Sequence, residues 1–221
     1  MSKMNVRLQL VNTSIVKVSL MIDIVLITGP QGSGKSTISD ELVRQSKLLK
    51  YDGVKQIKFA EPLYVLHEFI LNKMEGWTGT PRVPKDGPLL QLLGTEWGRE
   101  RLGQDLWVDI ARREIAKYAE MFSSSKNLVI IDDGRFPNEF DRCEDALRVR
   151  LECPEDVRKA RCPAWRDNTK HLSEIALDEY AAAGKFDMYL NTAGDDLQHC
   201  VALIGAQLQK KSWASKRKIV E

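Results

Sequence analysis

The stretch Ile22-Asp-Ile-Val-Leu-Ile-Thr-Gly-Pro-Gln-Gly-Ser-Gly-Lys-Ser36 decides the fold of this chain. Its first half, from Ile22 to Ile27, is a short apolar and β-branched run, which is typical of a buried parallel strand. Its second half, Gly29 to Ser36, satisfies the phosphate-loop pattern G-x-x-x-x-G-K-[ST]. An amphipathic segment follows, with Ile38 and Leu42 on one face. Strand, glycine-rich loop and helix therefore follow one another in the order that a nucleotide-binding loop requires.

The residue types of the loop predict how it binds a nucleoside triphosphate. Glycines let the backbone curl so that successive N–H groups converge on phosphate oxygens, and the following helix adds the positive end of its dipole. Lys35 is expected to reach the β- and γ-phosphates, and the Ser36 hydroxyl to ligate Mg²⁺. The predicted cofactors are therefore ATP and Mg²⁺. The predicted nucleotide-binding residues are Gly29, Gly32, Ser33, Gly34, Lys35, Ser36 and Thr37.

Apolar runs and amphipathic segments alternate along the rest of the chain. Further strands are expected around Ile57 and Phe59, at Leu128–Ile131, at Leu147–Leu151 and at Phe186–Leu190. Segments with helical periodicity lie between them. This alternation predicts an α/β fold of the P-loop NTPase type, with three α/β/α layers around a mostly parallel sheet.

Composition places the chain among ordinary globular proteins. It has 221 residues, 43% of them hydrophobic, and 33 lysines and arginines against 31 aspartates and glutamates give a net charge of +2. This size and hydrophobic content fit one α/β domain and exclude a disordered or fibrous chain. Because the net charge is close to zero, the chain has no overall positive potential that would bind nucleic acid non-specifically, so nucleic acid is not expected as a partner.

Cysteine spacing and hydropathy argue against a metal-binding, a disulfide-rich or a membrane-spanning protein. The four cysteines stand alone along the chain, without the spacing of a zinc site or a disulfide framework. The most apolar early stretch, Leu8 to Thr28, is interrupted by Lys17 and Asp23, so no membrane span is expected. We therefore expect a cytoplasmic protein without a membrane partner.

A second polar cluster follows the apolar run Leu128–Ile131, which continues into Asp132-Asp133-Gly134-Arg135. In an open parallel sheet the carboxyl ends of the strands face the ligand crevice, so these carboxylates are expected to point at the metal of the phosphate loop. Either Asp132 or Asp133 would hold Mg²⁺, and Arg135 would grip a phosphate or carboxylate with its planar fork. A solvated acidic turn that caps a helix from Asn138 is the alternative interpretation.

A phosphate loop alone does not identify the reaction, because GTPases, motor ATPases and small-molecule kinases share it. A guanine-reading N-K-x-D pattern is missing, since Asn72-Lys73-Met74-Glu75 ends in a glutamate. This disfavours a GTPase and leaves the kinases and ATPases to be separated by other features.

Five blocks, taken in order, resemble the phage-type deoxynucleoside monophosphate kinases of the P-loop nucleoside monophosphate kinase superfamily. They are the phosphate loop with Lys35, Phe59-Ala-Glu-Pro-Leu63, Leu90-Gln-Leu-Leu-Gly-Thr-Glu96 with Trp107-Val108, Asp133-Gly-Arg135 with Glu139, and His171-Leu-Ser-Glu174 with Asp187 to Asn191. The likeness extends from Met21 to about Leu208, and only the phosphate loop is specific by itself. It implies transfer of the ATP γ-phosphoryl group to a deoxynucleoside 5′-monophosphate, giving ADP and the deoxynucleoside diphosphate.

The resemblance also implies how the chain is divided. Residues 1–20 would be an N-terminal extension of unknown role, 21–210 a P-loop kinase domain and 211–221 a basic C-terminal tail. Within the domain, 58–110 would form a helical acceptor-nucleotide region and 154–171 a mobile lid. The implied partner is the small-molecule substrate, in the host cytoplasm if the chain is phage-encoded, and a homodimer is left open.

The resemblance and the chemistry of the reaction together supply candidate residues. Those expected to bind the acceptor are Phe59, Glu61, Pro62, Thr95, Arg99, Trp107, Arg135 and His171. Trp107 would stack on a base or else belong to the core, and His171 would touch phosphate or else cap a helix.

Phosphoryl transfer needs positive charge around the transferred group, which arginines supply. The residues expected to be catalytic are Lys35, Arg135, Arg158, Arg161 and Arg166, the last three in the lid. For each lid arginine, a surface charge paired with Glu155 or Asp156 is the alternative.

Two rival functions remain. A P-loop kinase of another acceptor, such as dephospho-coenzyme A or a modified base in DNA, would use the same loop, and the basic tail would suit DNA. A P-loop ATPase that couples hydrolysis to a partner would use no acceptor except water. The segment from Phe59 to Trp107 has the character of a substrate pocket and no DNA-binding motif is evident, which favours a small-molecule acceptor.

Overall fold

The computed structural model describes residues 22–81, 83, 85–162, 165 and 175–217, and in this part of the chain five strands form an all-parallel sheet of order β2-β3-β1-β4-β5. The strands are β1 (Ile22–Thr28), β2 (Gly53–Ile57), β3 (Asn127–Ile131), β4 (Leu147–Glu152) and β5 (Met188–Asn191). β1 is central, with Leu26 paired to Ile131 of β3 and Thr28 paired to Arg150 of β4. The predicted strands are confirmed with two main differences in their bounds. The second strand ends at Ile57 and Phe59 follows it in a loop, and the last strand begins at Met188, two residues after the predicted Phe186.

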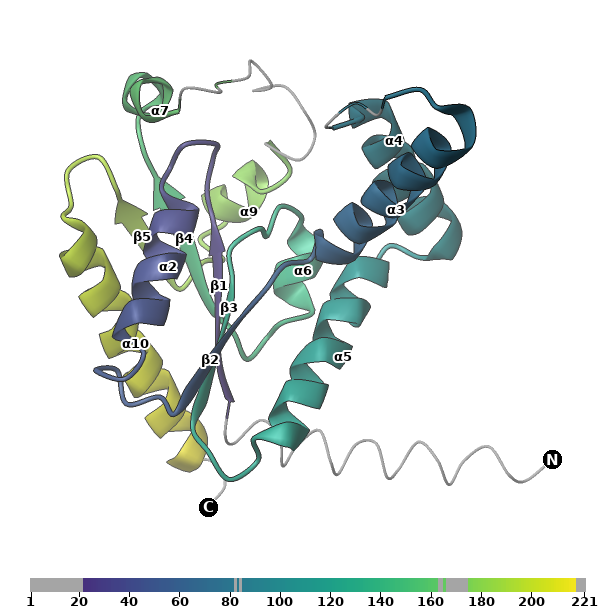
Figure 1. Cartoon of the computed structure of the whole chain (residues 1–221). Coiled ribbons are helices and arrows are strands. Elements are labelled where there is room, and N and C mark those ends of the chain that lie inside the picture. The colour runs from purple at the N-terminus through teal and green to yellow at the C-terminus, as the bar shows by residue number, and fades with distance from the viewer. Residues whose placement is uncertain (1–21, 82, 84, 163–164, 166–174, 218–221) are drawn as a thin grey trace, which may run out of the picture.

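Helices cover both faces of this sheet (Figure 1). One face carries α2 (Lys35–Gln45) and α10 (Leu197–Arg217), and the other carries α5 (Leu106–Met121), α6 (Pro137–Asp141) and α9 (Asp178–Ala182). The helices near the carboxyl ends of the strands are α3 (Glu61–Thr78), α4 (Gly87–Gln91), the π-helix η1 (Leu92–Leu102) and α7 (Glu155–Arg161). The predicted three-layer α/β/α fold is confirmed, and the described strands are all parallel.

Two apolar clusters join the layers, and the alternation of side chains along the strands separates them. In β3, Ile130 packs with the side chains of α2 and α10, whereas Ile131 packs with those of α5, α6 and α9. Both isoleucines are at most 1% exposed. The same alternation determines the face to which the carboxylates beyond β3 point.

The two ends of the chain differ in what the structure describes. The predicted extension, residues 1–20, lies outside the described residues. α10 continues to Arg217, so the helix extends into the predicted basic tail. At the start of that segment the ammonium of Lys211 donates to the carbonyl oxygen of Ala146 at 2.6 Å, which attaches this lysine to the body of the domain.

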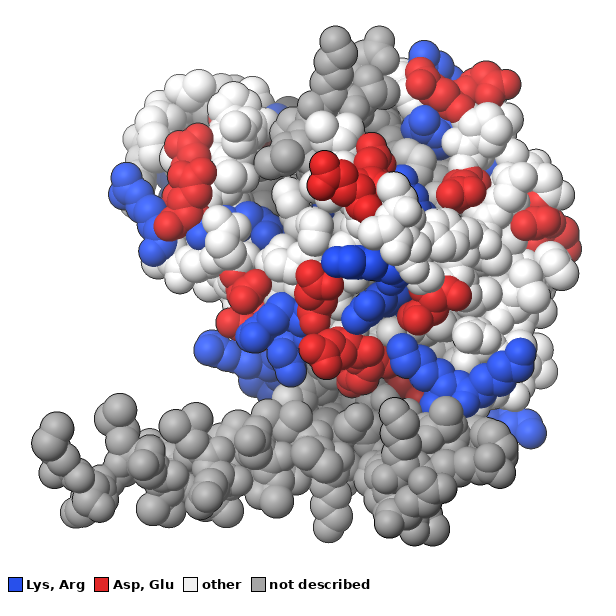
Figure 2. Space-filling model, turned by 180° about the vertical axis from the view of Figure 1, so that it is seen from behind, with Lys and Arg blue, Asp and Glu red and all other residues white. Residues whose placement is uncertain are grey.

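The surface carries charges of both signs. Lysine and arginine side chains are interspersed with aspartates and glutamates on the face turned away from the view of Figure 1 (Figure 2). Among the helices that the structure describes, none has both the length and the apolar composition that crossing a bilayer requires. Cys143, Cys153, Cys162 and Cys200 are all free thiols.

Candidate active site

The phosphate loop joins the end of β1 to the start of α2, as the sequence predicts. Gly32 and Gly34 have φ angles of +77° and +90°, a conformation that residues with a Cβ rarely adopt. At Gly32 a Cβ would also lie 2.9 Å from the carbonyl oxygen of Arg158 in α7. The loop is therefore tightly curled and enclosed on one side by α7.

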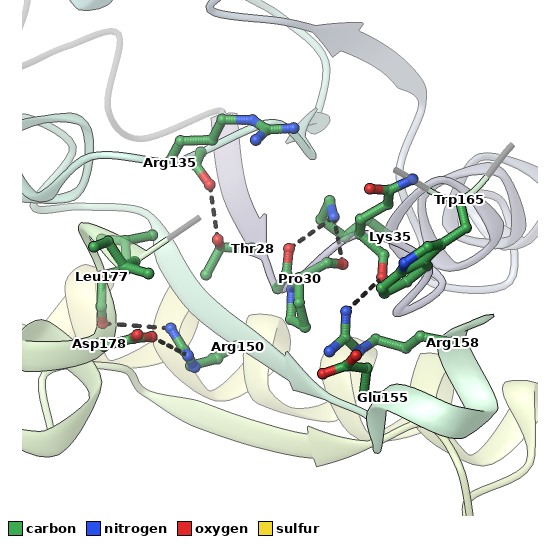
Figure 3. A pocket seen from close by; sticks show the side chains of 14 residues that line it. Thr28, Pro30, Lys35, Arg135, Arg150, Glu155, Arg158, Trp165, Leu177 and Asp178 are labelled. Carbon is green, nitrogen blue, oxygen red and sulfur yellow. Dashed lines mark hydrogen bonds and ion pairs between the residues drawn. The ribbon is translucent and has the colours of Figure 1, made fainter. Parts of the chain in front are cut away.

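Lys35 opens α2, and its ammonium lies at the mouth of the loop. Nζ donates to the carbonyl oxygens of Gly29 at 2.7 Å and of Pro30 at 3.0 Å. The lysine borders a cavity of about 270 Å³ that Arg135 and Arg158 also line (Figure 3). Arg150 of β4 lines it as well, so four cations from four different segments surround one cavity. This arrangement suits a ligand with several phosphate oxygens.

The other predicted nucleotide-binding residues surround the first turn of α2. Ser33 is fully buried, and its carbonyl oxygen accepts a hydrogen bond of 2.9 Å from the hydroxyl of Thr192, just beyond β5. This bond fixes the loop to the end of the sheet. Ser36 and Thr37 are exposed, so the hydroxyl of Ser36 is open to a ligand.

The arginines of α7 make defined contacts with the loop and with β5. Arg158 donates from Nη1 to the carbonyl oxygen of Gln31 and from Nε to that of Cys153, both at 3.0 Å. Arg161 donates to the carbonyl oxygen of Thr192 at 3.0 Å and does not border the cavity. Of the two arginines of the predicted lid that the structure describes, Arg158 is therefore the one that borders the cavity. Arg166 and His171, also predicted for the site, lie outside the described residues.

Asp133, at the end of β3, holds the loop that leads into α3. Its two carboxylate oxygens accept hydrogen bonds of 3.0 Å from the backbone N–H groups of Phe59 and Ala60. Burial raises the pKa of Asp133 above its usual range, although these two N–H groups lower it. The aspartate thus fixes the first residues of the predicted acceptor region to the sheet.

Asp132 points to the opposite face. It is buried, and its Oδ1 lies 3.0 Å from the ammonium of Lys58. Partial burial lowers the pKa of Lys58, but the hydrogen bond to Asp132 and the charges of Asp132, Asp133 and Asp40 raise it overall. Lys58 thus lies near both Asp132 and Asp40, and Asp40 belongs to α2. Asp132 therefore lies on the face of the sheet that α2 covers.

The donor set on the α2 face fits Mg²⁺. This ion takes hard oxygen ligands, usually one or two from the protein, and keeps several waters. The open hydroxyl of Ser36 and the carboxylate of Asp132 are of this kind. Asp133 fits less well, because both of its oxygens already hold backbone N–H groups.

Two aromatic residues predicted to touch the acceptor are in the core. Trp107 is 4% exposed and Phe59 is 3% exposed, and both belong to the cluster between the sheet and α5. The indole N–H of Trp107 donates to the carbonyl oxygen of Gly94 at 3.0 Å, and a Cβ at Gly98 would lie 2.6 Å from its Cζ2 atom. The indole therefore packs η1 against α5. Of the two roles expected for Trp107, the structure shows the place in the core and not stacking on a base.

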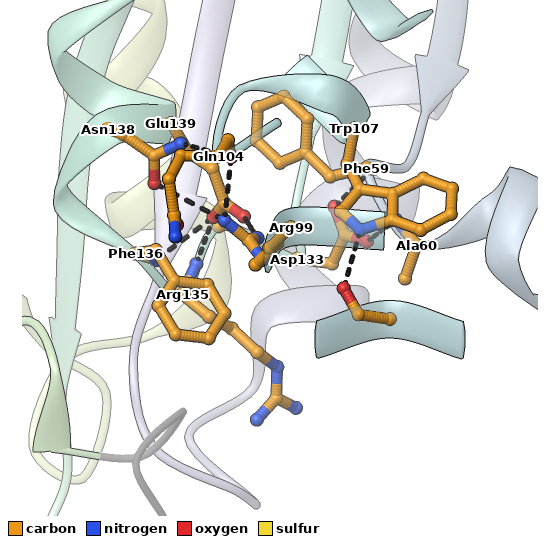
Figure 4. A network of polar contacts seen from close by, with 12 residues as sticks. Phe59, Ala60, Arg99, Gln104, Trp107, Asp133, Arg135, Phe136, Asn138 and Glu139 are labelled. Atoms are coloured by element: carbon orange, nitrogen blue, oxygen red, sulfur yellow. Dashed lines mark hydrogen bonds and ion pairs between the residues drawn. The ribbon is translucent and has the colours of Figure 1, made fainter. Parts of the chain in front are cut away.

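Four other predicted acceptor residues, Glu61, Pro62, Thr95 and Arg99, lie in α3 and η1 and do not border the cavity. Glu61 is exposed at the start of α3, and Pro62 and Thr95 are half-buried. Arg99 is different, because its guanidinium forms an ion pair of 2.8 Å with the buried carboxylate of Glu139 (Figure 4). Its side chain is 10% exposed, so little of it is open to a ligand.

Sequence reasoning missed part of the cavity wall. The lining residues outside the predicted site are Thr28, Pro30, Gln31, Gly134, Arg150, Glu155, Trp165, Ile175, Leu177 and Asp178. Arg150 lies in β4, where it pairs with Thr28 at the end of β1 and forms an ion pair of 3.0 Å with Asp178. The signal that reveals it is its position at the carboxyl end of a strand adjacent to β1.

The comparisons with known proteins concern the domain as a whole. A search of curated proteins finds no match. Among solved structures, shikimate kinase from Bacteroides thetaiotaomicron is 16% identical, with a TM-score of 0.43 and coverage of 85% of this chain and 98% of that one. Shikimate kinase from Aquifex aeolicus is 15% identical, with a TM-score of 0.40 and coverage of 86% and 98%.

A third structure, an uncharacterized protein from Eubacterium ventriosum, is 12% identical, with a TM-score of 0.41 and coverage of 85% of this chain and 98% of that one. The family model described as AAA domain (AAA_18) matches residues 25–181, which include the phosphate loop, the end of β3 and α7. The chain therefore belongs to the AAA domain family.

Proposed function

We propose that this protein is a phosphotransferase that moves the γ-phosphoryl group of ATP to a deoxynucleoside 5′-monophosphate, giving ADP and the diphosphate. The observation that carries the phosphotransferase is the cavity beside the phosphate loop, where Lys35, Arg135 and Arg158 converge. The acceptor class rests on the five blocks that resemble the phage-type kinases, and on that resemblance we assign the activity to DNA precursor synthesis in the cytoplasm.

Positioning and charge do most of the work in such a transfer. The backbone N–H groups of the loop would hold the β- and γ-phosphates, and Lys35 would leave its two carbonyl partners for phosphate oxygens. Arg135 and Arg158 would face the transferred group from the loop after β3 and from α7. Glu61, Pro62 and Thr95 would contact the acceptor. Mg²⁺, held by Ser36 and Asp132, would neutralise charge that develops on the phosphate oxygens.

The experiment that tests the proposal measures ADP release with ATP and Mg²⁺. The acceptors are the deoxynucleoside and ribonucleoside monophosphates, with dephospho-coenzyme A, shikimate, DNA and no acceptor beside them. We expect turnover that depends on one or a few deoxynucleoside monophosphates. Turnover with dephospho-coenzyme A, shikimate or DNA alone would identify a kinase of another acceptor, and equal ADP release without any acceptor would identify an ATPase.

The two aspartates beyond β3 are predicted to have separable effects. Asp132→Asn removes the charge on the α2 face, so we expect the Mg²⁺ concentration for half-maximal rate to rise about 10- to 100-fold. Asp133→Asn retains an oxygen for only one of its two N–H partners, so we expect a change in the KM of the acceptor with little change in Mg²⁺ dependence. The rate of each variant is measured as a function of the Mg²⁺ concentration. If Asp133→Asn and not Asp132→Asn raises the Mg²⁺ requirement, Asp133 is the metal ligand.

A further inference from the structure

One short segment, Asp133 to Glu139, connects the sheet to both ends of the predicted acceptor region. At its start Asp133 accepts the N–H groups of Phe59 and Ala60, immediately before α3. At its end Glu139 accepts a hydrogen bond of 2.8 Å from Nη2 of Arg99, near the end of η1. Two carboxylates on one segment thus hold residues that lie 40 positions apart in the sequence.

Glu139 uses both carboxylate oxygens. It is 2% exposed, and its Oε2 accepts the backbone N–H groups of Arg135 at 2.6 Å and of Phe136 at 3.0 Å. Its Oε1 accepts from Arg99. Burial raises the pKa of Glu139, while the two N–H groups and the Arg99 guanidinium lower it. A single buried carboxylate therefore joins η1 to the backbone that carries Arg135.

The guanidinium of Arg99 is fixed from several sides (Figure 4). Besides the ion pair with Glu139, its Nη1 donates to the carbonyl oxygen of Gln104 at 3.3 Å, and its Cζ lies 4.1 Å from the ring centroid of Phe136. A buried ion pair contributes little net stability, because desolvation offsets the attraction. The ion pair between Arg99 and Glu139 therefore matters mainly because it fixes the position of η1 relative to the segment that carries Glu139.

The side chain of Arg135 connects this network to the cavity. It lines the cavity together with Lys35, whereas its backbone N–H is held by Glu139. The position of η1, which carries Thr95, and the position of Arg135 are consequently set by the same carboxylate. Displacing one would displace the other.

We propose that Glu139 is a positioning residue, which acts through Arg99 and through the Arg135 backbone to fix the acceptor region against the cavity. This inference rests on the proposed phosphotransferase activity. It gives Arg99 a positioning role in place of the direct substrate contact that the sequence predicts. The alternative is that Glu139 only caps α6, a role that needs Oε2 but not the bond to Arg99.

Glu139→Gln separates the two roles, because the amide oxygen still accepts backbone N–H groups while the amide nitrogen cannot accept from Arg99. A misplacement of about 1 Å near a reacting group costs about 100-fold, so we expect kcat/KM for the acceptor to fall by about that factor. The KM of ATP should stay within about twofold of the wild-type value. Arg99→Gln should behave alike, and the double variant should be no worse than either single one.

Asp109→Asn is the matched control. It breaks an ion pair of 2.9 Å between Asp109 of α5 and Arg142 at the end of α6, with both side chains nearly half exposed. Exposed pairs of this kind contribute little, so its kinetic constants should equal those of the wild type. Additive effects of the two network variants, or equal losses for ATP and acceptor together with a lower melting temperature, would reduce Glu139 to a helix cap.

Hydrogen exchange distinguishes the failure of this inference from the failure of the proposed function. In Glu139→Gln we expect faster amide exchange over residues 92–102, and in Asp109→Asn no change. Unaltered exchange in Glu139→Gln would overturn the positioning role whatever the activity. If no acceptor supports turnover in the wild type, the proposed function fails, and exchange alone then decides whether Glu139 holds η1.

Discussion

Lys35→Ala is expected to lower phosphoryl transfer by about 10³-fold, the loss that follows removal of a charged group aimed at developing phosphate charge. The ammonium lies at the mouth of the loop and borders the cavity. The steady-state rate at saturating ATP and acceptor measures the effect. The loss should be mainly in kcat, because the interaction strengthens in the transition state.

The fold should survive this change. The hydrogen bonds from Lys35 to the carbonyl oxygens of Gly29 and Pro30 lie within its own loop, so the free energy of unfolding should fall by no more than about 1–2 kcal/mol. Lys210→Ala, at an exposed lysine of α10, is the control for losing a positive charge and should retain full rate. A folded Lys35→Ala protein that keeps more than a tenth of the wild-type rate would contradict the assignment of the phosphate loop.

Trp107→Ala is expected to destabilise the protein by about 3–5 kcal/mol, the usual cost of replacing a buried large aromatic side chain by alanine. The indole is 4% exposed, lies against Gly98, and satisfies the carbonyl oxygen of Gly94. Its loss leaves a cavity and an unpaired acceptor between α5 and η1. Equilibrium unfolding in urea or guanidinium measures the change.

Trp77→Ala is the matched control for this prediction. Trp77 lies in α3 and is 77% exposed, so its replacement should change the free energy of unfolding by no more than about 0.5 kcal/mol. Equally small losses for both variants would mean that the burial of Trp107 contributes little to the stability of the protein. A stable Trp107→Ala protein with a weakened acceptor KM would restore the base-stacking role that the sequence allows.

Local patterns predicted the scaffold well. Ile22 to Ile27 and Leu128 to Ile131 are apolar runs bounded by turn residues, and both are strands in the middle of the sheet. The phosphate loop is equally local, because its conformation depends on glycines within a few positions. Features fixed by neighbouring residues can be predicted from one sequence.

The wall of the site depends on contacts between distant segments, and these were predicted less well. Arg99 carries a charge that fits a phosphate, yet Glu139, 40 residues later, takes its guanidinium. Asp133 belongs to the block Asp133-Gly-Arg135 and was a candidate ligand of Mg²⁺, but its oxygens accept from N–H groups of a loop 73 and 74 residues earlier. Residue type states which bonds a side chain is able to form, and only the tertiary fold selects the partner.

The position of β1 between β3 and β4 has a consequence for how the protein gains its activity. The cavity is bordered by the ends of all three strands, through Thr28, Gly134 and Arg150, and the hydroxyl of Thr28 already bonds to the Gly134 carbonyl across 106 residues. Such separations make sheet assembly a slow, chain-wide step. During synthesis the loop sequence emerges long before β4, so the nascent chain acquires its phosphate pocket only when most of the domain has left the ribosome.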